Sequence, residues 1–118
     1  MIFESELKIL EFLWDEGDLT AKELAIRLNE STNWSKTTTY TVIKNCIEKG
    51  LVERLEHNFT CRATITREEA QKRESEILVE KMFFGSSELL LSSLLGGKKL
   101  TSSQVDLLRT IAKEFAAL

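Results

Sequence analysis

The apolar residues of this chain change from helical to extended spacing at Gly50, and this change limits the folds open to it. Before Gly50 they recur every three or four positions, which is the period of an amphipathic helix. After it, Leu51–Leu55 and Phe59–Ile65 have the pattern of extended strands. The three residues between them form a tight turn, in which Asn58 can adopt a left-handed backbone. The sequence therefore predicts a helical segment followed by a β-hairpin.

Helix start signals divide the segment before Gly50 into three helices. Ser5 can cap the first, and Thr20 with Glu23 forms a capping box for a second helix that ends near Asn29. Ser35 is a good N-cap for the third, and a glycine follows its end. The order of three helices and then a hairpin is that of a winged helix-turn-helix, in which the hairpin is the wing. The expected inward side of the first helix is Leu7, Leu10, Leu13 and Trp14.

The third helix has two different sides. Its apolar side holds Val42, Ile43, Cys46 and Ile47, whereas the other side holds lysines and threonines. β-Branched threonine has a lower helix propensity than alanine, so propensity does not explain four threonines in the first turns. Net charge is −3, but no acidic residue lies between Glu30 and Glu48. A locally positive surface on an acidic chain is compatible with phosphate contact.

The second and third helices have the organisation of a helix-turn-helix, whose second helix enters the major groove of DNA. Short hydroxyl side chains can reach phosphates and base edges there, and a threonine methyl can pack on a thymine methyl. From the residues alone, a solvated helix in a generic three-helix domain is an equal alternative. The candidate DNA-binding residues are Ser35, Lys36, Thr37, Thr38, Tyr40, Thr41, Lys44, Arg54, His57, Asn58 and Arg62.

The last third of the chain is expected to form a helical dimerisation domain, residues 68–118, after a DNA-binding domain of residues 1–67. A second capping box at Thr66–Glu69 opens a helix to about Phe84, a short helix spans Leu89–Leu95, and Thr101 or Ser102 caps the last. Amphipathic helices next to a domain with its own core can bury their apolar sides against a second copy. Folding back on the first domain is the alternative. The candidate dimerisation residues are Ile77, Leu78, Met82, Phe83, Leu90, Leu91, Leu94, Leu108, Ile111 and Phe115.

Other functional classes find little support in the sequence. There is one histidine, and no Ser/His/Asp set or glycine-rich phosphate loop, so we expect no enzyme, no cofactor and no small-molecule ligand. His57 and Cys61 lack the paired spacing of a zinc site, so no metal is expected. A thiol redox or metal enzyme would need Cys46 and Cys61 to meet. No apolar run is long enough to cross a membrane and the start lacks signal-peptide features, so a cytoplasmic protein with reduced cysteines is expected.

Specific residues resemble the penicillinase repressor family (the BlaI/MecI/CopY group) over essentially the whole chain. They are Glu6-Leu7, Leu13-Trp14, Thr20 to Leu24, Asn33 to Thr38 with Thr41, Ile47 to Val52, and Phe83 to Ser86. The resemblance implies a homodimer that binds a palindromic operator and represses antibiotic- or metal-resistance genes. The predicted function is thus a dimeric, sequence-specific DNA-binding repressor. The alternative is a winged-helix module for protein–protein interaction without DNA binding.

Departures from the family pattern affect the expected inducing signal. The family's β-lactam branch is inactivated by cleavage of an Asn-Phe bond, where this chain has Ser93-Leu94, and its copper branch carries Cys-x-Cys motifs that do not occur after Cys61. Neither the β-lactam sensor protease nor copper(I) is therefore expected to release this protein from DNA. Lys36 stands where many relatives have proline, and Asn58 where many have glycine. Operator sequence and regulated genes do not follow from these residues.

Overall fold

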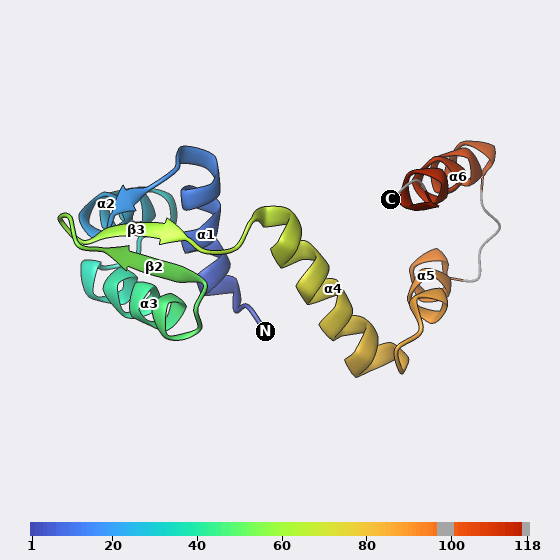
Figure 1. The fold of residues 1–118 in the computed structure, drawn as a ribbon, viewed down its shortest axis with the longest axis horizontal. Helices are drawn as coiled ribbons and strands as arrows, with labels where there is room; N and C mark the ends of the chain where they lie inside the picture. The colour runs from blue at the N-terminus through green and yellow to red at the C-terminus, as the bar shows by residue number, and fades with distance from the viewer. Residues whose placement is uncertain (97–100, 117–118) are drawn as a thin grey trace. The chain divides into compact units, whose positions relative to one another are not determined.

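The computed structural model describes residues 1–96 and 101–116. As the sequence predicts, the fold is mainly helical with a small β-hairpin, to which a third, short strand is added (Figure 1). Two compact units divide the chain, Met1–Ile77 and Leu78–Leu118. In chain order the elements are α1 (Glu4–Glu16), β1 (Leu19–Thr20), α2 (Ala21–Thr32), α3 (Lys36–Glu48), β2 (Val52–Leu55), β3 (Thr60–Ala63), α4 (Arg67–Phe83), α5 (Ser87–Leu95) and α6 (Ser102–Ala116).

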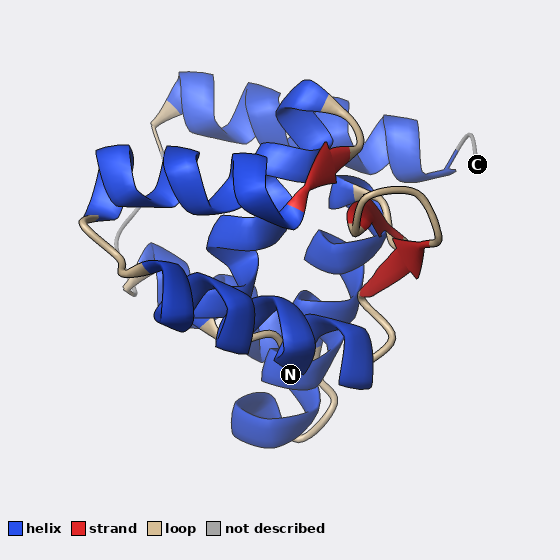
Figure 2. Cartoon of the chain, turned by 90° about the vertical axis from the view of Figure 1, so that its left-hand side faces the viewer, coloured by secondary structure: helices blue, strands red, loops and turns tan. Residues whose placement is uncertain are grey.

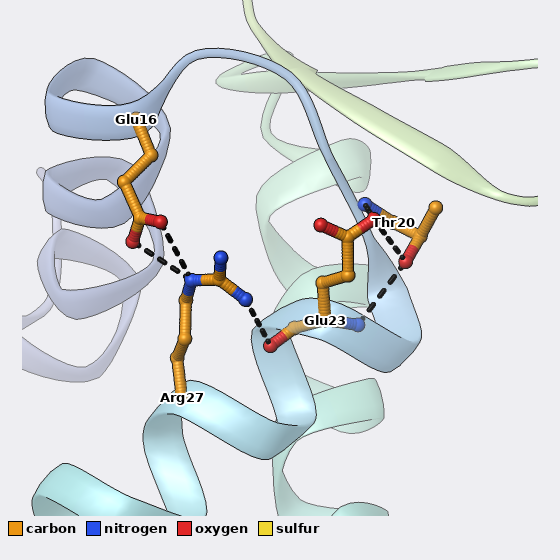
Figure 3. Close-up of polar contacts among 4 residues, drawn as sticks. All are labelled: Glu16, Thr20, Glu23 and Arg27. Atoms are coloured by element: carbon orange, nitrogen blue, oxygen red, sulfur yellow. Dashed lines mark hydrogen bonds and ion pairs between the residues drawn. The ribbon is translucent and has the colours of Figure 1, made fainter.

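The start of α2 is fixed by the predicted capping box and by an ion pair to α1 (Figure 3). The Thr20 hydroxyl accepts a hydrogen bond from the Glu23 amide at 3.1 Å, and the Glu23 carboxylate accepts from the Thr20 amide at 3.4 Å. Arg27 reaches from α2 to both carboxylate oxygens of Glu16 at 2.8 Å. Both contacts are made by the Arg27 Nε, so this is one bifurcated, charge-assisted hydrogen bond. These contacts set α2 against the end of α1.

The sheet is antiparallel with strand order β1-β3-β2, so β3 is central. Leu55 pairs with Thr60 at the turn, and Cys61 pairs with Arg54 on one side and Leu19 on the other. The strand β1 was not predicted, because two residues carry no periodicity. The pairing of β1 with β3 joins the segment between α1 and α2 to the wing, which is the β2–β3 hairpin. Figure 2 shows the short strands in red beside the helices in blue.

The core of the first unit is formed by apolar side chains from α1, α2, α3 and the sheet. Three expectations for this region are wrong in detail. Phe3, not Ser5, is the N-cap of α1, and α2 continues to Thr32 beyond the expected end near Asn29. Leu7 is exposed, and the buried positions of α1 include Glu6. The buried core residues are Ile9, Leu10, Leu13, Leu19, Ala21, Leu24, Leu28, Val42, Ile43, Cys46, Leu51, Val52 and Cys61.

Two of the helices after the sheet begin at the predicted caps, Thr66 and Thr101, whereas α5 begins at Ser87, two residues before the expected Leu89, with Ser86 as its cap. The hydroxyl of Thr66 accepts from the Glu69 amide at 3.1 Å, that of Ser86 from Leu89 at 3.2 Å, and that of Thr101 from Gln104 at 3.2 Å. Within α4 only Ala70 is buried, and within α5 no residue is. Of the candidate dimerisation residues, Leu78, Met82, Leu91 and Leu94 are exposed, and Ile77, Phe83 and Leu90 are half-buried. The side chains of Leu108, Ile111 and Phe115 lie outside the described residues.

Candidate DNA interface

The connection between α2 and α3 places the first turn of α3 at the surface. Asn33 ends α2 in the left-handed conformation, with φ of +59°. The Asn29 side chain donates to the Trp34 carbonyl at 3.1 Å, which holds the connection close to α2. Ser35 caps α3 as predicted, accepting from the Thr38 amide at 3.1 Å, and its hydroxyl bonds that of Thr38 at 2.9 Å. A three-residue connection thus fixes where the helix begins.

One side of α3 is exposed and carries no acidic group from Lys36 to Lys44; its first carboxylate is Glu48, in the last turn. The exposed members are Lys36, Thr37, Thr38, Thr41 and Lys44, and the hydroxyl of Thr41 donates to the Thr37 carbonyl at 3.0 Å. Lys36, Thr37, Tyr40, Thr41 and Lys44 line a shallow, open hollow of about 470 Å³. The N-terminus of α3, with its partial positive charge, lies at Lys36. This side of the helix combines positive charge, hydroxyl groups and accessibility.

The threonines of α3 do not all share that side. Thr39 is fully buried among the core positions of α3, whereas Thr37, Thr38 and Thr41 are exposed. Tyr40 is half-buried, with its ring 5.9 Å from that of Phe59 and nearly perpendicular to it. Helical periodicity accounts for the difference among the threonines, because Thr39 lies one turn before Val42 and Ile43 on the apolar side of α3.

The wing supplies a second group of exposed polar side chains. His57 and Asn58 lie in the turn and are exposed, and Asn58 has the left-handed backbone expected of it, with φ of +53°. Arg54 is exposed on β2, with its guanidinium carbon 3.8 Å from the centre of the Phe59 ring. Phe59 was not among the predicted site residues. Its sequence signal, an aromatic residue directly after the turn, is also that of an ordinary strand residue.

Arg62 differs from the other predicted cations because it is engaged by carboxylates. It lies 2.9 Å from the Asp18 carboxylate and 3.7 Å from that of Glu53. The hydrogen bond to Asp18 raises the pKa of the Arg62 guanidinium. Asp18 precedes β1, so the pairing of β1 with β3 creates this contact. A phosphate would have to compete with Asp18 for this side chain.

The two cysteines have the properties of core residues. Both are fully buried, and burial raises the pKa of the Cys46 thiol to about 12 and that of Cys61 to about 11. A thiolate is the reactive and metal-binding form of cysteine, and these pKa values disfavour it at neutral pH. In residues 1–96 and 101–116 no cluster of three or more His, Cys, Asp or Glu side chains is placed to hold a metal ion. None of the helices in these ranges is long and apolar enough to cross a membrane.

Comparison with known proteins identifies a family and, among other matches, solved structures of similar fold. The family described as penicillinase repressor matches residues 2–114. The solution structure of the DNA-binding domain of the repressor BlaI has a TM-score of 0.54 and 21% identity, over 58% of this chain and 87% of that domain. The monomeric form of Bacillus licheniformis BlaI, in complex with the blaP half-operator, has a TM-score of 0.51 with the same identity and coverage. No curated protein sequence matches the chain.

Proposed function

The chain belongs to the penicillinase repressor family, and from this premise we propose that it represses transcription by binding double-stranded DNA in a sequence-specific manner. In this proposal α3 lies in the major groove. The observation that carries it is the exposed side of α3, which has no acidic group before Glu48 although the protein as a whole is acidic. The BlaI structures of similar fold support DNA as the partner, since one of them is in complex with a half-operator.

The hydroxyls of Thr37, Thr38 and Thr41 are the groups that we assign to base edges. They are short and exposed, so the helix backbone can approach the bases closely. Ser35 and the α3 N-terminus, together with Lys36, suit a phosphate because the helix dipole and amide groups favour an anion there. Tyr40, which lines the same hollow of the protein, is assigned to contact with the wall of the DNA major groove.

Phosphate contacts from the rest of the unit follow from charge and accessibility. Lys44 lies farther along α3, and Arg54 extends from the wing, with His57 and Asn58 at its tip. Each phosphate neutralised by a cation releases counterions, so these contacts add affinity without reading sequence. Arg62 joins them only by exchanging Asp18 for a phosphate.

The homodimer is the second part of the proposal. A palindromic operator offers two identical half-sites, and a two-fold dimer places one α3 on each. The exposed apolar side chains of α4 and α5, among them Leu78, Met82 and Leu94, provide surface that a second copy would cover. We assign residues 1–67 to DNA binding and 68–118 to dimerisation. The cytoplasm, which holds the bacterial chromosome, is the proposed location.

Two alanine variants test the proposal by separating base contacts from phosphate contacts. An operator is first selected as the genomic DNA that the purified protein retains. Thr41→Ala should weaken operator binding by about 1–3 kcal/mol and random DNA little, because base contacts carry discrimination. Lys44→Ala should weaken both DNAs similarly and lower the salt slope by about one. Thermal melts should be unchanged, because both side chains are exposed.

Matched controls exist elsewhere in the chain. Thr110 in α6 donates to the Asp106 carbonyl at 3.0 Å, which is the same local bond that Thr41 makes to Thr37. Thr110→Ala should therefore leave operator binding intact, as should Lys72→Ala on α4. Operator binding unaffected by Thr41→Ala would place the recognition surface on another side of α3. Absence of any salt-dependent DNA binding would favour the protein–protein interaction module.

A further inference from the structure

We propose that Phe59 is a positioning residue, which joins the wing to α3 and holds one cation of each in place for DNA phosphates. The inference rests on the proposed function. It extends that function to a side chain that is not assigned to DNA contact. The evidence is a row of four side chains, Arg54, Phe59, Tyr40 and Lys36, that we call the aromatic row.

The backbone of Phe59 shows that its position is fixed by its surroundings. Its φ is +51°, directly after Asn58 at +53°. Asparagine tolerates this left-handed region, but a bulky aromatic residue adopts it rarely and only where its neighbours determine it. The carbonyl of Phe59 accepts a hydrogen bond from the Ala21 amide at 3.0 Å, at the first residue of α2. The backbone of Phe59 thus joins the wing to the helix-turn-helix.

The ring of Phe59 continues this connection on both sides. On the wing side, the Arg54 guanidinium carbon lies 3.8 Å from the ring centre. On the other side the Tyr40 ring meets it edge-on, with centres 5.9 Å apart and an angle of 88° between the planes. The Nζ of Lys36 in turn lies 5.7 Å from the centre of the Tyr40 ring. Cation, ring, ring and cation therefore follow one another from β2 to the start of α3.

This arrangement has a consequence for binding. Arginine and lysine side chains are flexible, and ordering them on association costs free energy. A cation held over a ring is already partly ordered, while the N–H groups of a guanidinium at its edge stay free to donate to a phosphate. Arg54 and Lys36 are both exposed, so the row leaves their charged ends accessible. Phe59 thereby sets the spacing between a wing cation and an α3 cation.

The first test compares Phe59→Leu and Phe59→Tyr in the full chain, using a random-sequence duplex of about 30 base pairs over a salt series. Phe59→Leu keeps an apolar side chain but removes the ring, and should weaken binding about three- to tenfold. The salt slope should stay unchanged, because the same phosphates are still contacted. Phe59→Tyr keeps the ring and should bind like the unaltered protein. A purely structural role would instead lower the melting temperature without this selective loss.

The second test is a double-mutant cycle between Phe59 and Arg54. Arg54→Ala removes a phosphate contact and should lower the salt slope by about one. In the Arg54→Ala background, Phe59→Leu should weaken binding by less than about twofold, because the guanidinium that the ring would hold in place is already absent. Leu55→Ala, in the same strand but outside the row, is the matched control and should bind normally. If Phe59→Leu is unfolded at the temperature of measurement, Tyr40→Leu is cycled against Lys36→Ala with the same expectation.

Additive losses in the cycle, or unchanged DNA affinity of a folded Phe59→Leu variant, would overturn this inference and leave the proposed function standing. Failure of the unaltered protein to bind the duplex would overturn both. Coupled losses with an unchanged salt slope and a normal Phe59→Tyr variant would establish Phe59 as the residue that positions the two cations.

Discussion

The two units of the chain differ in how far their apolar side chains are buried. In the first unit, Leu24 and Ile43 are completely buried, whereas in the second, Met82 is 59% and Leu94 73% exposed. The difference is not one of composition, because α5 is the most leucine-rich helix. Burial in the first unit comes from three helices and a sheet that enclose one core. The first unit thus buries its apolar residues within one copy, whereas the described apolar side chains of the second unit form the surface that we propose a second copy covers.

The largest effect is expected when the exposed apolar surface receives charge. The unaltered chain should sediment as a dimer, and a Met82→Glu, Leu94→Glu double variant as a monomer, because an unpaired charge is costly in an apolar interface. Loss of the second half-site contact should reduce palindrome affinity by about 100-fold or more. Ile26→Glu alters an exposed apolar residue of the first unit and should leave the dimer intact. If the unaltered chain is a monomer at tens of micromolar, the second unit does not bury its apolar side chains against a second copy, and the proposed difference between the units is wrong.

A matched pair of leucines compares the two units directly. Leu24→Ala should lower the free energy of unfolding by about 2–5 kcal/mol at any protein concentration, because it opens a cavity in a closed core. Leu94→Ala should lower the free energy of unfolding only by weakening the dimer. At dilutions where the protein is monomeric, its cost should fall below about 0.5 kcal/mol, as for other surface substitutions. Urea unfolding at several protein concentrations measures both, and a concentration-independent loss for Leu94→Ala would show that the second unit has its own core.

Ion pairs provide a smaller effect within the first unit. Glu6 is 1% exposed, and its carboxylate accepts from Lys49 and from the Phe3 amide, each at 2.7 Å. Lys49→Met leaves this buried charge without its cation and should cost about 1–3 kcal/mol, given that Lys49 is partly exposed. Arg27→Met breaks the exposed pair with Glu16 and should cost less than about 1 kcal/mol. Equal losses in urea unfolding would mean that burial does not distinguish the two pairs.

The smallest effect concerns the thiols, which report on the first unit alone. The folded pKa values, about 12 for Cys46 and about 11 for Cys61, lie above the ordinary value of 9.0. The neutral thiols therefore stabilise the fold fully below pH 9, and this contribution is lost as the pH rises toward 11–12. Iodoacetamide at neutral pH should label neither cysteine in the folded protein and both in urea. Rapid labelling under native conditions would show that the core opens readily.

The starts of α2, α3 and α6 could be predicted from the sequence because their chemistry is local. Thr20 with Glu23, Ser35 with Thr38, and Thr101 with Gln104 are three residues apart, and each pair forms the expected hydrogen bond. The exposed side of α3 was predicted for the same reason, since helical periodicity assigns its sides. The DNA-binding and dimerisation roles of the individual residues remain predictions.

Other features depend on residues that meet only after folding. Arg62 and Asp18 are 44 positions apart and Lys49 and Glu6 are 43 apart, so no local pattern indicates either pair. The same limitation led to the wrong placement of Leu7 on the buried side of α1. It also concealed Phe59, whose importance lies in contacts with Tyr40 in α3 and with α2.

The sequence by itself determined the order of the helices and the hairpin, the caps of α2, α3, α4 and α6, and the change from helix to hairpin at Gly50, because hydrogen bonds and steric preferences act over a few residues. Tertiary structure alone decided that Glu6 is paired with Lys49 and that Arg62 is engaged by Asp18. It also decided that Arg54 and Lys36 belong to one aromatic row. The physical reason is that burial and charge pairing depend on distances in space, which the packing of α1, α2 and α3 against the sheet sets.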